Sequence, residues 1–373
     1  MDNKKYFRVM FHCVNGTGLG HITRAINISK IILKNKIASE ILIESDGKYT
    51  PKNLPRKVNF LTLKYTNHQM YKNPKLRIKQ EQIVKKIITD FKPDIFVVDN
   101  ETPIFIKNNK LPNVRKIFVL RSVEEEFLSN NLNLLKRSYD KIIIPHTKKE
   151  FNFLYSRKTI KKLEQDKFIF VGPIIRQEKT KNVKKKYDFI ATIGGGGLHH
   201  NPKKPGTFFK TSEENLKIIC ETFRKLKREN AKLRLGVLCG QNFPVKSFKE
   251  LKKKFGEEIN IIYASESPLN IYKKTKVLIS QLGYNTTFEA IKYKIPSIFF
   301  MKKSIPESQF LRGKWVEKNN LGIFIPNLSQ KNLFKEIRNL DYLKINKIKN
   351  NLRRFNLGEN SKKILRVFEN GKK

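Results

Sequence analysis

A histidine ends a short glycine-rich segment near the start of the chain. The segment reads Gly16-Thr-Gly18-Leu-Gly20-His21; it follows an apolar run at 8–14 and precedes a helical pattern that begins at Ile22. The start of a helix disfavours a protonated histidine, and a general base must be neutral near pH 7. We therefore interpret His21 as a catalytic or acceptor-binding residue, with capping of the turn as the alternative. Because His21 replaces the last glycine, the match to the GxGxxG dinucleotide fingerprint is only partial.

A second junction, "SQLGYNTTFEA" at 280–290, follows a strand-like run at 277–280. Gly283 is expected to make the turn, and Asn285 or Thr286 to cap the helix that follows. Amides and the Thr286 hydroxyl at this N-terminus would hold a diphosphate without a metal. Glu289 lies one turn further on the same face, where it could accept hydrogen bonds from ribose hydroxyls. A capping box formed by Thr286 and Glu289 is the structural alternative.

Two further polar segments follow strand-like runs in the second half of the chain. Four consecutive glycines begin at Gly194, and their entropic cost suggests that the backbone must pass close to a ligand, although a flexible loop is weighed equally. His199 and His200 have no metal-ligand partners at a readable spacing and are interpreted as exposed loop residues. The segment 304–315 is expected to be a polar loop suited to the hydroxyls of a sugar. Its polar side chains are those of Glu307, Gln309 and Arg312.

Short apolar runs alternate with amphipathic stretches along the chain, which predicts an α/β fold with parallel sheets and crossover helices. The predicted strands are 8–14, 40–44, 58–63, 95–99, 116–120, 141–144, 168–171, 188–193, 233–238, 259–263, 277–280 and 297–301. All three glycine-rich junctions follow strand ends, where ligands bind in such sheets. A polar, charge-dense stretch at 173–186 reads as a linker. It separates a domain at 1–172 from a second at 187–350.

Lysine and arginine give the chain a formal net charge of +45. This excess fits a nucleic-acid binder, an enzyme held on an anionic membrane surface, or a lysine-rich genome, and its even spread favours the last. Three scattered cysteines argue against a disulfide framework or zinc site and for a reducing cytoplasm. No apolar run approaches 18 residues, so neither a membrane span nor a secretion signal is expected.

Several of these motifs occur in the order seen in one enzyme family. "GTGLGHITRA", "IGGGG", "SQLGYNTTFEAIKYKIPSIFF" and "PESQFLRGKW" resemble MurG-type glycosyltransferases of the GT-B fold, family 28-like. The similarity is greatest to the bacterial predicted glycosyltransferases that carry a GLGH turn. The resemblance implies two Rossmann-like domains facing each other across a cleft, with acceptor on the N-terminal side and nucleotide-sugar donor on the C-terminal side. It also implies that a C-terminal helix, 351–373, packs back on the first domain.

The resemblance assigns residues by position. The catalytic candidates are His21 and Asp99; the acceptor-side loop is Gly18, Gly20 and Thr23; the donor-binding residues are Gly194, Gly195, Gly196, Gly283, Tyr284, Asn285, Thr286, Glu289, Glu307 and Gln309. Asp99, at the end of the run "IFVVD", is a rival base or an orienter of His21. Gln281 stands where retaining enzymes generally carry a glutamate, which favours an inverting mechanism. Asp99-x-Glu101 lies on the acceptor side, so we discount it as a metal site.

The sequence thus predicts a metal-independent, inverting glycosyltransferase without a cofactor, using a nucleoside-diphosphate sugar, most simply a UDP-sugar. A nucleotide-sugar hydrolase or 2-epimerase on the same fold is one alternative. A nucleic-acid-binding protein, or a transferase acting on nucleic acid, is another. The expected location is cytoplasmic, with peripheral contact to an anionic membrane or to polyanions left open. The acceptor and the oligomeric state stay unassigned.

Overall fold

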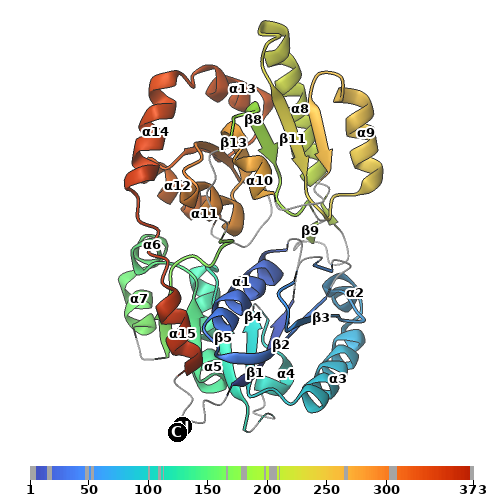
Figure 1. Cartoon of the computed structure of the whole chain (residues 1–373), viewed down its shortest axis with the longest axis vertical. Coiled ribbons are helices and arrows are strands. Elements are labelled where there is room, and N and C mark those ends of the chain that lie inside the picture. Colours follow the sequence, from blue (N-terminus) through green and yellow to red (C-terminus); the bar gives the residue numbers. More distant parts are fainter. Residues whose placement is uncertain are drawn as a thin grey trace. The chain divides into compact units, whose positions relative to one another are not determined.

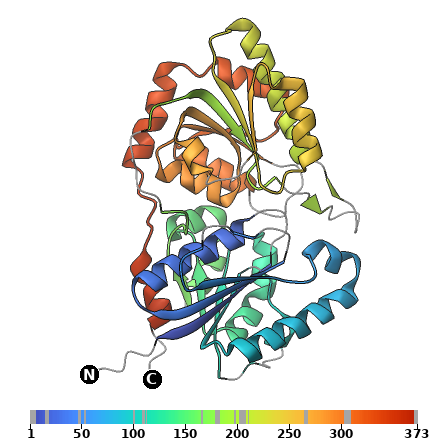
Figure 2. The same cartoon turned by 45° about the vertical axis from the view of Figure 1, so that its right-hand side comes forward.

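The chain folds into two α/β units, formed by residues 1–176 with 358–373 and by residues 177–357 (Figures 1 and 2). The computed structural model describes residues 6–14, 19–46, 50–51, 54–99, 101–107, 111, 113–164, 167–177, 183–196, 199–200, 208–209, 211–263, 268–301 and 309–369. Both units contain a parallel sheet with helices on its faces, as the alternating pattern predicts.

The first unit contains a seven-stranded parallel sheet in the order β3-β2-β1-β4-β5-β6-β7. Its strands are β1 (Phe7–Cys13), β2 (Ala38–Ser45), β3 (Val58–Thr62), β4 (Ile95–Asp99), β5 (Arg115–Val119), β6 (Lys141–Ile144) and β7 (Phe168–Phe170). Its helices are α1 (Gly20–Lys34), α2 (Asn67–Lys72), α3 (Pro74–Phe91), α4 (Ile104–Lys107), α5 (Glu125–Ser138), α6 (Lys148–Leu154), α7 (Arg157–Leu163) and α15 (Ser361–Glu369).

Successive side chains of each strand point to opposite faces of the sheet, so they pack into two separate hydrophobic cores. Val9 and Phe11 of β1 pack with α1 and α15, whereas Met10 packs with α3 and α5 on the opposite face. Because both faces are covered, the strands read as continuous apolar runs. His12 follows Met10 at the same period and therefore lies on the α3 side of the sheet.

The end of the chain returns to the first unit. In place of one helix over 351–373, helix α14 (Tyr342–Arg354) and the separate α15 are present. The Asn360 amide donates to the Val171 carbonyl at 2.9 Å, and Arg115 donates to the Phe368 carbonyl at 3.1 Å. A Cβ on Gly172 would lie 2.2 Å from the Gly358 carbonyl oxygen, so the two segments can touch only because this position has no side chain.

The second unit repeats the sheet order with its own strands, as β12-β11-β8-β13-β14-β15. These are β8 (Tyr187–Thr192), β11 (Leu235–Cys239), β12 (Asn260–Tyr263), β13 (Thr275–Gln281), β14 (Ser297–Phe300) and β15 (Ile323–Ile325). Its other helices are α8 (Thr211–Glu229), α9 (Val245–Phe255), α10 (Leu269–Tyr272), α11 (Tyr284–Lys292), α12 (Gln309–Lys318) and α13 (Gln330–Arg338). Helices α8, α9 and α13 cover one face. A short antiparallel pair, β9 (His199–His200) and β10 (Phe208–Phe209), lies where a loop was predicted.

All twelve predicted strands are present, with ends shifted by at most two residues; β9, β10 and β15 were missed. No helix among the described residues is long and apolar enough to cross a membrane. The three cysteines are buried and form no disulfide with one another.

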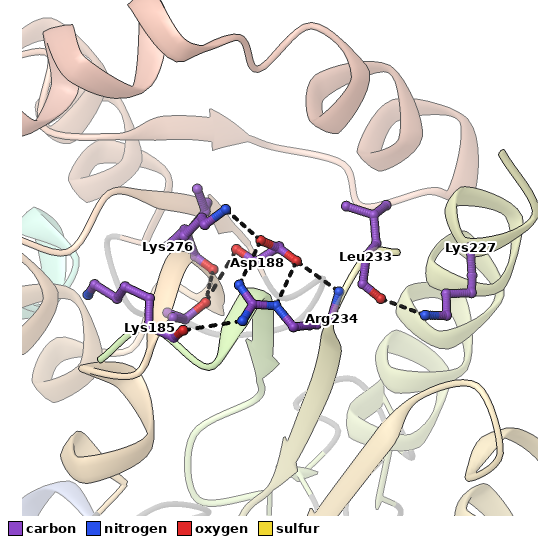
Figure 3. A network of polar contacts seen from close by, with 8 residues as sticks. Lys185, Asp188, Lys227, Leu233, Arg234 and Lys276 are labelled. Atoms are coloured by element: carbon purple, nitrogen blue, oxygen red, sulfur yellow. Dashed lines mark hydrogen bonds and ion pairs between the residues drawn. The ribbon is translucent and has the colours of Figure 1, made fainter. Parts of the chain in front are cut away.

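A polar network joins the amino ends of the three central strands of the second sheet (Figure 3). Asp188 of β8 accepts from the Lys276 ammonium at 2.8 Å and from the Arg234 amide at 2.8 Å. Burial opposes ionisation of Asp188, but these hydrogen bonds outweigh it and lower its pKa. The network lies at the amino ends of the strands, whereas the glycine-rich junctions follow the carboxyl ends. We therefore interpret the network as stabilising the fold of this unit.

We expect Asp188→Ala to lower the free energy of unfolding by about 1–3 kcal/mol at pH 7, because a backbone donor and a lysine lose their acceptor. A carboxylate whose pKa is lowered by folding stabilises the protein at pH values above its pKa in the unfolded chain, near 3.9. This stabilisation is lost as the pH falls through the pKa of the folded state. The difference from wild type should therefore shrink below about pH 4. Urea unfolding at neutral and acidic pH measures this difference. Asp188→Asn keeps one oxygen for the Arg234 amide and should therefore lower the free energy of unfolding by less than Asp188→Ala.

Candidate active site

Both sheets have a point at which the strand order reverses, between β1 and β4 and between β8 and β13. Chain segments leaving two such neighbouring strands diverge to opposite faces, which opens a crevice at their carboxyl ends. The segment before His21 follows β1, and Asp99 ends β4. In the second sheet, Gly194 follows β8 and Gly283 follows β13. The predicted residues therefore gather at the two places where this topology binds ligands.

His21 and Asp99, far apart in sequence, meet in the first unit. His21 Nδ1 lies 2.8 Å from Asp99 Oδ1. Arg24, one turn after His21, donates from Nε to Asp99 Oδ2 at 2.7 Å and from Nη2 to Oδ1 at 2.9 Å. Arg24 and Asp99 are buried, and the His21 side chain is 12% exposed. The imidazole therefore binds a carboxylate instead of capping its helix.

The charges of this group decide which residue can accept a proton. Burial opposes ionisation of Asp99, but the charge of Arg24 and the contact with His21 hold its pKa well below its usual value. Asp99 is therefore a carboxylate that accepts the Nδ1 proton of His21, and the unprotonated Nε2 is left as the basic atom. Burial and the charges of Arg24 and Arg121 lower the pKa of His21, and together they outweigh Asp99, which raises it, so the imidazole is neutral near pH 7. The arrangement suits His21 as base and Asp99 as its orienter.

The remaining residues of the predicted acceptor-side loop are less informative. Gly18 lies outside the described residues; Gly20 opens α1, and the Thr23 amide donates to the Leu19 carbonyl at 2.9 Å. Arg24 was not singled out from the sequence. Its position three residues after His21 places both on one helix face, and that spacing could have indicated the pairing.

The glycines after β8 adopt conformations that favour glycine. Gly194 and Gly196 have φ values of 68° and 76°, and the Gly195 carbonyl accepts from the Asn242 amide at 2.9 Å. A Cβ on Gly240 would lie 2.1 Å from the Gly194 carbonyl oxygen. The turn is therefore held against the segment that follows β11.

Helix α11 begins earlier than expected, because its cap lies two residues before Asn285 and three before Thr286. Its N-cap is Gly283, so Asn285 and Thr286 lie within the first turn, and the predicted side-chain cap and Thr286–Glu289 capping box are wrong. A glycine can serve as the cap because its extended backbone already accepts the Thr287 amide, at 3.0 Å. The amides of the first turn, including that of Tyr284, have no carbonyl partners within the helix. This correction strengthens the anion-binding character of the N-terminus.

Gly283 has no conformational or packing reason to be glycine. Its φ is −72° and its ψ 146°, values open to any residue, and no described atom lies within 4 Å of where its Cβ would be. Nearby, the Oδ1 atom of Asn285 is buried without a hydrogen-bond partner among the described residues. Thr286 and Glu289 are also buried, at 8% and 1% exposure. The N-terminus of α11 therefore has open space in front of Gly283 and polar groups beside it, which are the features that a phosphate site requires.

The segment predicted as a polar loop is in part a helix. Glu307 lies outside the described residues, whereas Gln309 is buried at the first position of α12. Arg312 is fully buried and donates from Nη1 to the Leu282 carbonyl at 3.1 Å, directly before Gly283. Arg312 therefore positions the turn before α11 instead of facing a sugar from a loop.

Comparisons with known proteins agree with this fold. No protein-family model matches the chain. A Thermosipho melanesiensis UDP-N-acetylglucosamine–N-acetylmuramyl-(pentapeptide) pyrophosphoryl-undecaprenol N-acetylglucosamine transferase is 27% identical over 269 residues, covering 70% of this chain and 68% of that protein. The MurG structure of Acinetobacter baumannii (TM-score 0.58, 10% identity) covers 97% of this chain and 99% of its own. A Polygonum tinctorium UDP-glucosyltransferase structure (TM-score 0.65, 13% identity) covers 98% of both chains.

Proposed function

Because the chain is a MurG-like glycosyltransferase of the GT-B fold, we propose that it transfers a sugar from a UDP donor to an acceptor hydroxyl, with inversion and without a metal. The related transferase is named for a UDP-sugar, which supports uridine as the nucleoside. Gln281 at the end of β13, in place of a glutamate, supports inversion.

The observation that carries the donor site is the glycine cap of α11. Gly283 leaves open space before the first-turn amides, where the two phosphates would accept hydrogen bonds. The amides of Tyr284, Asn285 and Thr286 and the positive end of the helix dipole would stabilise the charge that a metal ion offsets in other transferases. Glu289, one turn further along α11, would accept hydrogen bonds from the ribose hydroxyls.

In the proposed reaction, the acceptor hydroxyl gives its proton to His21 Nε2 while its oxygen attacks the anomeric carbon. The bond from that carbon to the β-phosphate oxygen breaks on the opposite face, and UDP leaves with the bonding electrons. Asp99 stabilises the imidazolium that forms and keeps Nε2 directed at the acceptor. Donors already in place at α11 stabilise the leaving diphosphate without reorganisation.

We expect Gly283→Ala to weaken UDP binding about tenfold or more, because a methyl group fills the space next to the diphosphate and one amide hydrogen bond is worth about 1–3 kcal/mol when a charge is involved. The free energy of unfolding should fall by less than about 1 kcal/mol, since the backbone conformation suits alanine. Ser329→Ala is the matched control. It removes the N-cap of α13, where Ser329 Oγ accepts from the Asn332 amide at 3.1 Å. It should lower stability without changing UDP affinity.

Release of UDP from a UDP-sugar tests the reaction class. A transferase releases UDP at full rate only when an acceptor is present, whereas a hydrolase or epimerase acts on the donor alone. Full-rate turnover of UDP-sugars without any acceptor would therefore overturn the proposal.

A further inference from the structure

A second histidine–carboxylate pair lies in the first unit, next to a cavity of about 270 Å³. The cavity lies at the carboxyl ends of β1, β2 and β3 and against α2 and α3. Its polar wall is formed by His12, Asp46, Arg77, Gln80, Glu81 and Glu101. Apolar side chains, among them Met70 and Phe105, complete it. The volume is near the lower end of the range for ligand sites, roughly 300–1,000 Å³, and suits a single small ring.

His12 presents one ring nitrogen for a ligand. Its Nδ1 atom lies 2.6 Å from Glu44 Oε1, the residue opposite it on β2. The His12 side chain is 8% exposed and Glu44 is fully buried. Because Glu44 occupies Nδ1, Nε2 is the nitrogen that can bond to a molecule in the cavity. Glu44 orients His12 as Asp99 orients His21.

The charges in the cavity wall are mixed and paired. Arg77 lies 2.7 Å from Glu101 and 3.9 Å from Glu81. Positive and negative groups therefore face the space together, and Asp46 adds a carboxylate that is only 4% exposed. A cationic ligand would meet the donor groups of Arg77, and an anionic ligand would meet the carboxylates. Hydroxyl groups can accept from the first set and donate to the second.

We propose that this cavity binds the acceptor, and that the acceptor part it holds is a neutral saccharide ring. The hydroxyls would bond to His12 Nε2, Asp46 and Glu101, and the C–H faces would pack on Met70 and Phe105. The inference rests on the proposed transferase function. The chain itself joins the cavity to Asp99, the partner of the proposed base His21, since Glu101 follows Asp99 by two residues.

Three sugars that differ in charge test the proposal, because each of the two charged sugars differs from glucose at a single carbon. Glucose, glucosamine and glucuronate share one ring but are neutral, cationic and anionic at pH 7. In saturation-transfer-difference NMR and calorimetry on the full chain, glucose should bind at least about fivefold more tightly than the other two, because each charged ring loses one set of partners. Tighter binding of glucosamine or glucuronate, or no binding of glucose, would overturn the proposal.

A matched pair of variants assigns the binding to this cavity. Glu101→Gln should weaken glucose binding about fivefold or more, because it removes a charged acceptor. Glu40→Gln should leave it unchanged. Glu40 is also a half-exposed glutamate of the first unit in an ion pair with arginine, 3.2 Å from Arg8, but it does not line the cavity. Equal affinity in both variants would contradict the assignment.

A UDP titration of the same samples separates this inference from the proposed function. UDP binding without glucose binding would reject the acceptor inference alone. Glucose binding without UDP binding would reject the transferase proposal, and with it the cavity's role as acceptor site.

Discussion

We expect His21→Gln to lower the rate of sugar transfer by about 10²–10⁴-fold while UDP affinity stays within about twofold of wild type. The substitution removes the imidazole that Asp99 orients and that is neutral near pH 7. Glutamine can still hydrogen-bond to Asp99, but it cannot take a proton. The loss should therefore be in kcat and not in donor binding.

The pH profile gives a second signature of this base. Burial lowers the pKa of His21, so its neutral form persists below the usual value of about 6.5. The rate of the wild-type enzyme should accordingly stay high as the pH falls through 6.5 and decline only at lower pH.

The pair formed by His146 and Glu150, 2.9 Å apart and fully buried, provides the matched control. His146→Gln should lower stability by about 1–3 kcal/mol and leave the transfer rate per folded molecule unchanged. Equal loss of rate in both histidine variants, or an unchanged rate in His21→Gln, would contradict the assignment.

The second large effect is expected from Arg24→Leu, which should lower the free energy of unfolding at pH 7 by about 3–5 kcal/mol. Asp99 is buried, and Arg24 supplies two of its hydrogen bonds. Without the guanidinium, His21 is the remaining side-chain partner of this buried carboxylate among the described residues. Urea unfolding of the purified variant measures the loss.

In this variant, the contribution of Asp99 to the free energy of unfolding should depend on pH with the opposite sign to that in the wild type. In the wild type, Asp99 has a lowered pKa, so its contribution is present above about pH 3.9 and is lost as the pH falls through the folded value. In Arg24→Leu we expect the pKa of Asp99 in the folded protein to lie above its value in the unfolded chain. Lowering the pH toward that folded pKa should therefore reduce the difference in the free energy of unfolding between the variant and the wild type. Arg24→Leu/Asp99→Leu should recover part of the loss, because no buried charge remains. A double variant less stable than the single one would contradict this account.

The strands could be predicted from the sequence because buried parallel strands are uninterrupted apolar runs. The positions of the candidate residues at the carboxyl ends of these strands could be predicted with them. The fully buried β4 was predicted to the residue. β15 was missed because three residues, Ile323–Ile325, are too short to show a pattern. α12 was missed because its buried residues include Gln309, Arg312 and Gly313, so no apolar stripe marks the helix.

Side-chain pairing was the part that the sequence could not provide. His21 and Asp99 were both named, and the spacing of Arg24 from His21 places the two on one helix face, but the contact of Arg24 with Asp99 became evident only when β4 was placed beside β1. The pairing of His12 with Glu44 depends on the register between β1 and β2, which neither strand reveals by itself. The cap of α11 was misplaced because Asn285 and Thr286 are better caps than the glycine that occupies the position.

Calorimetric titration of UDP in EDTA, with GDP and dTDP as comparators, tests the central claim most directly. We predict that UDP binds the wild-type protein without metal, and that Glu289→Ala weakens it about tenfold or more, with the isosteric Glu289→Gln as companion. Folding of each variant is checked by circular dichroism. A folded wild-type protein that binds none of the three nucleotides would contradict the donor site at α11 and the transferase function built on it.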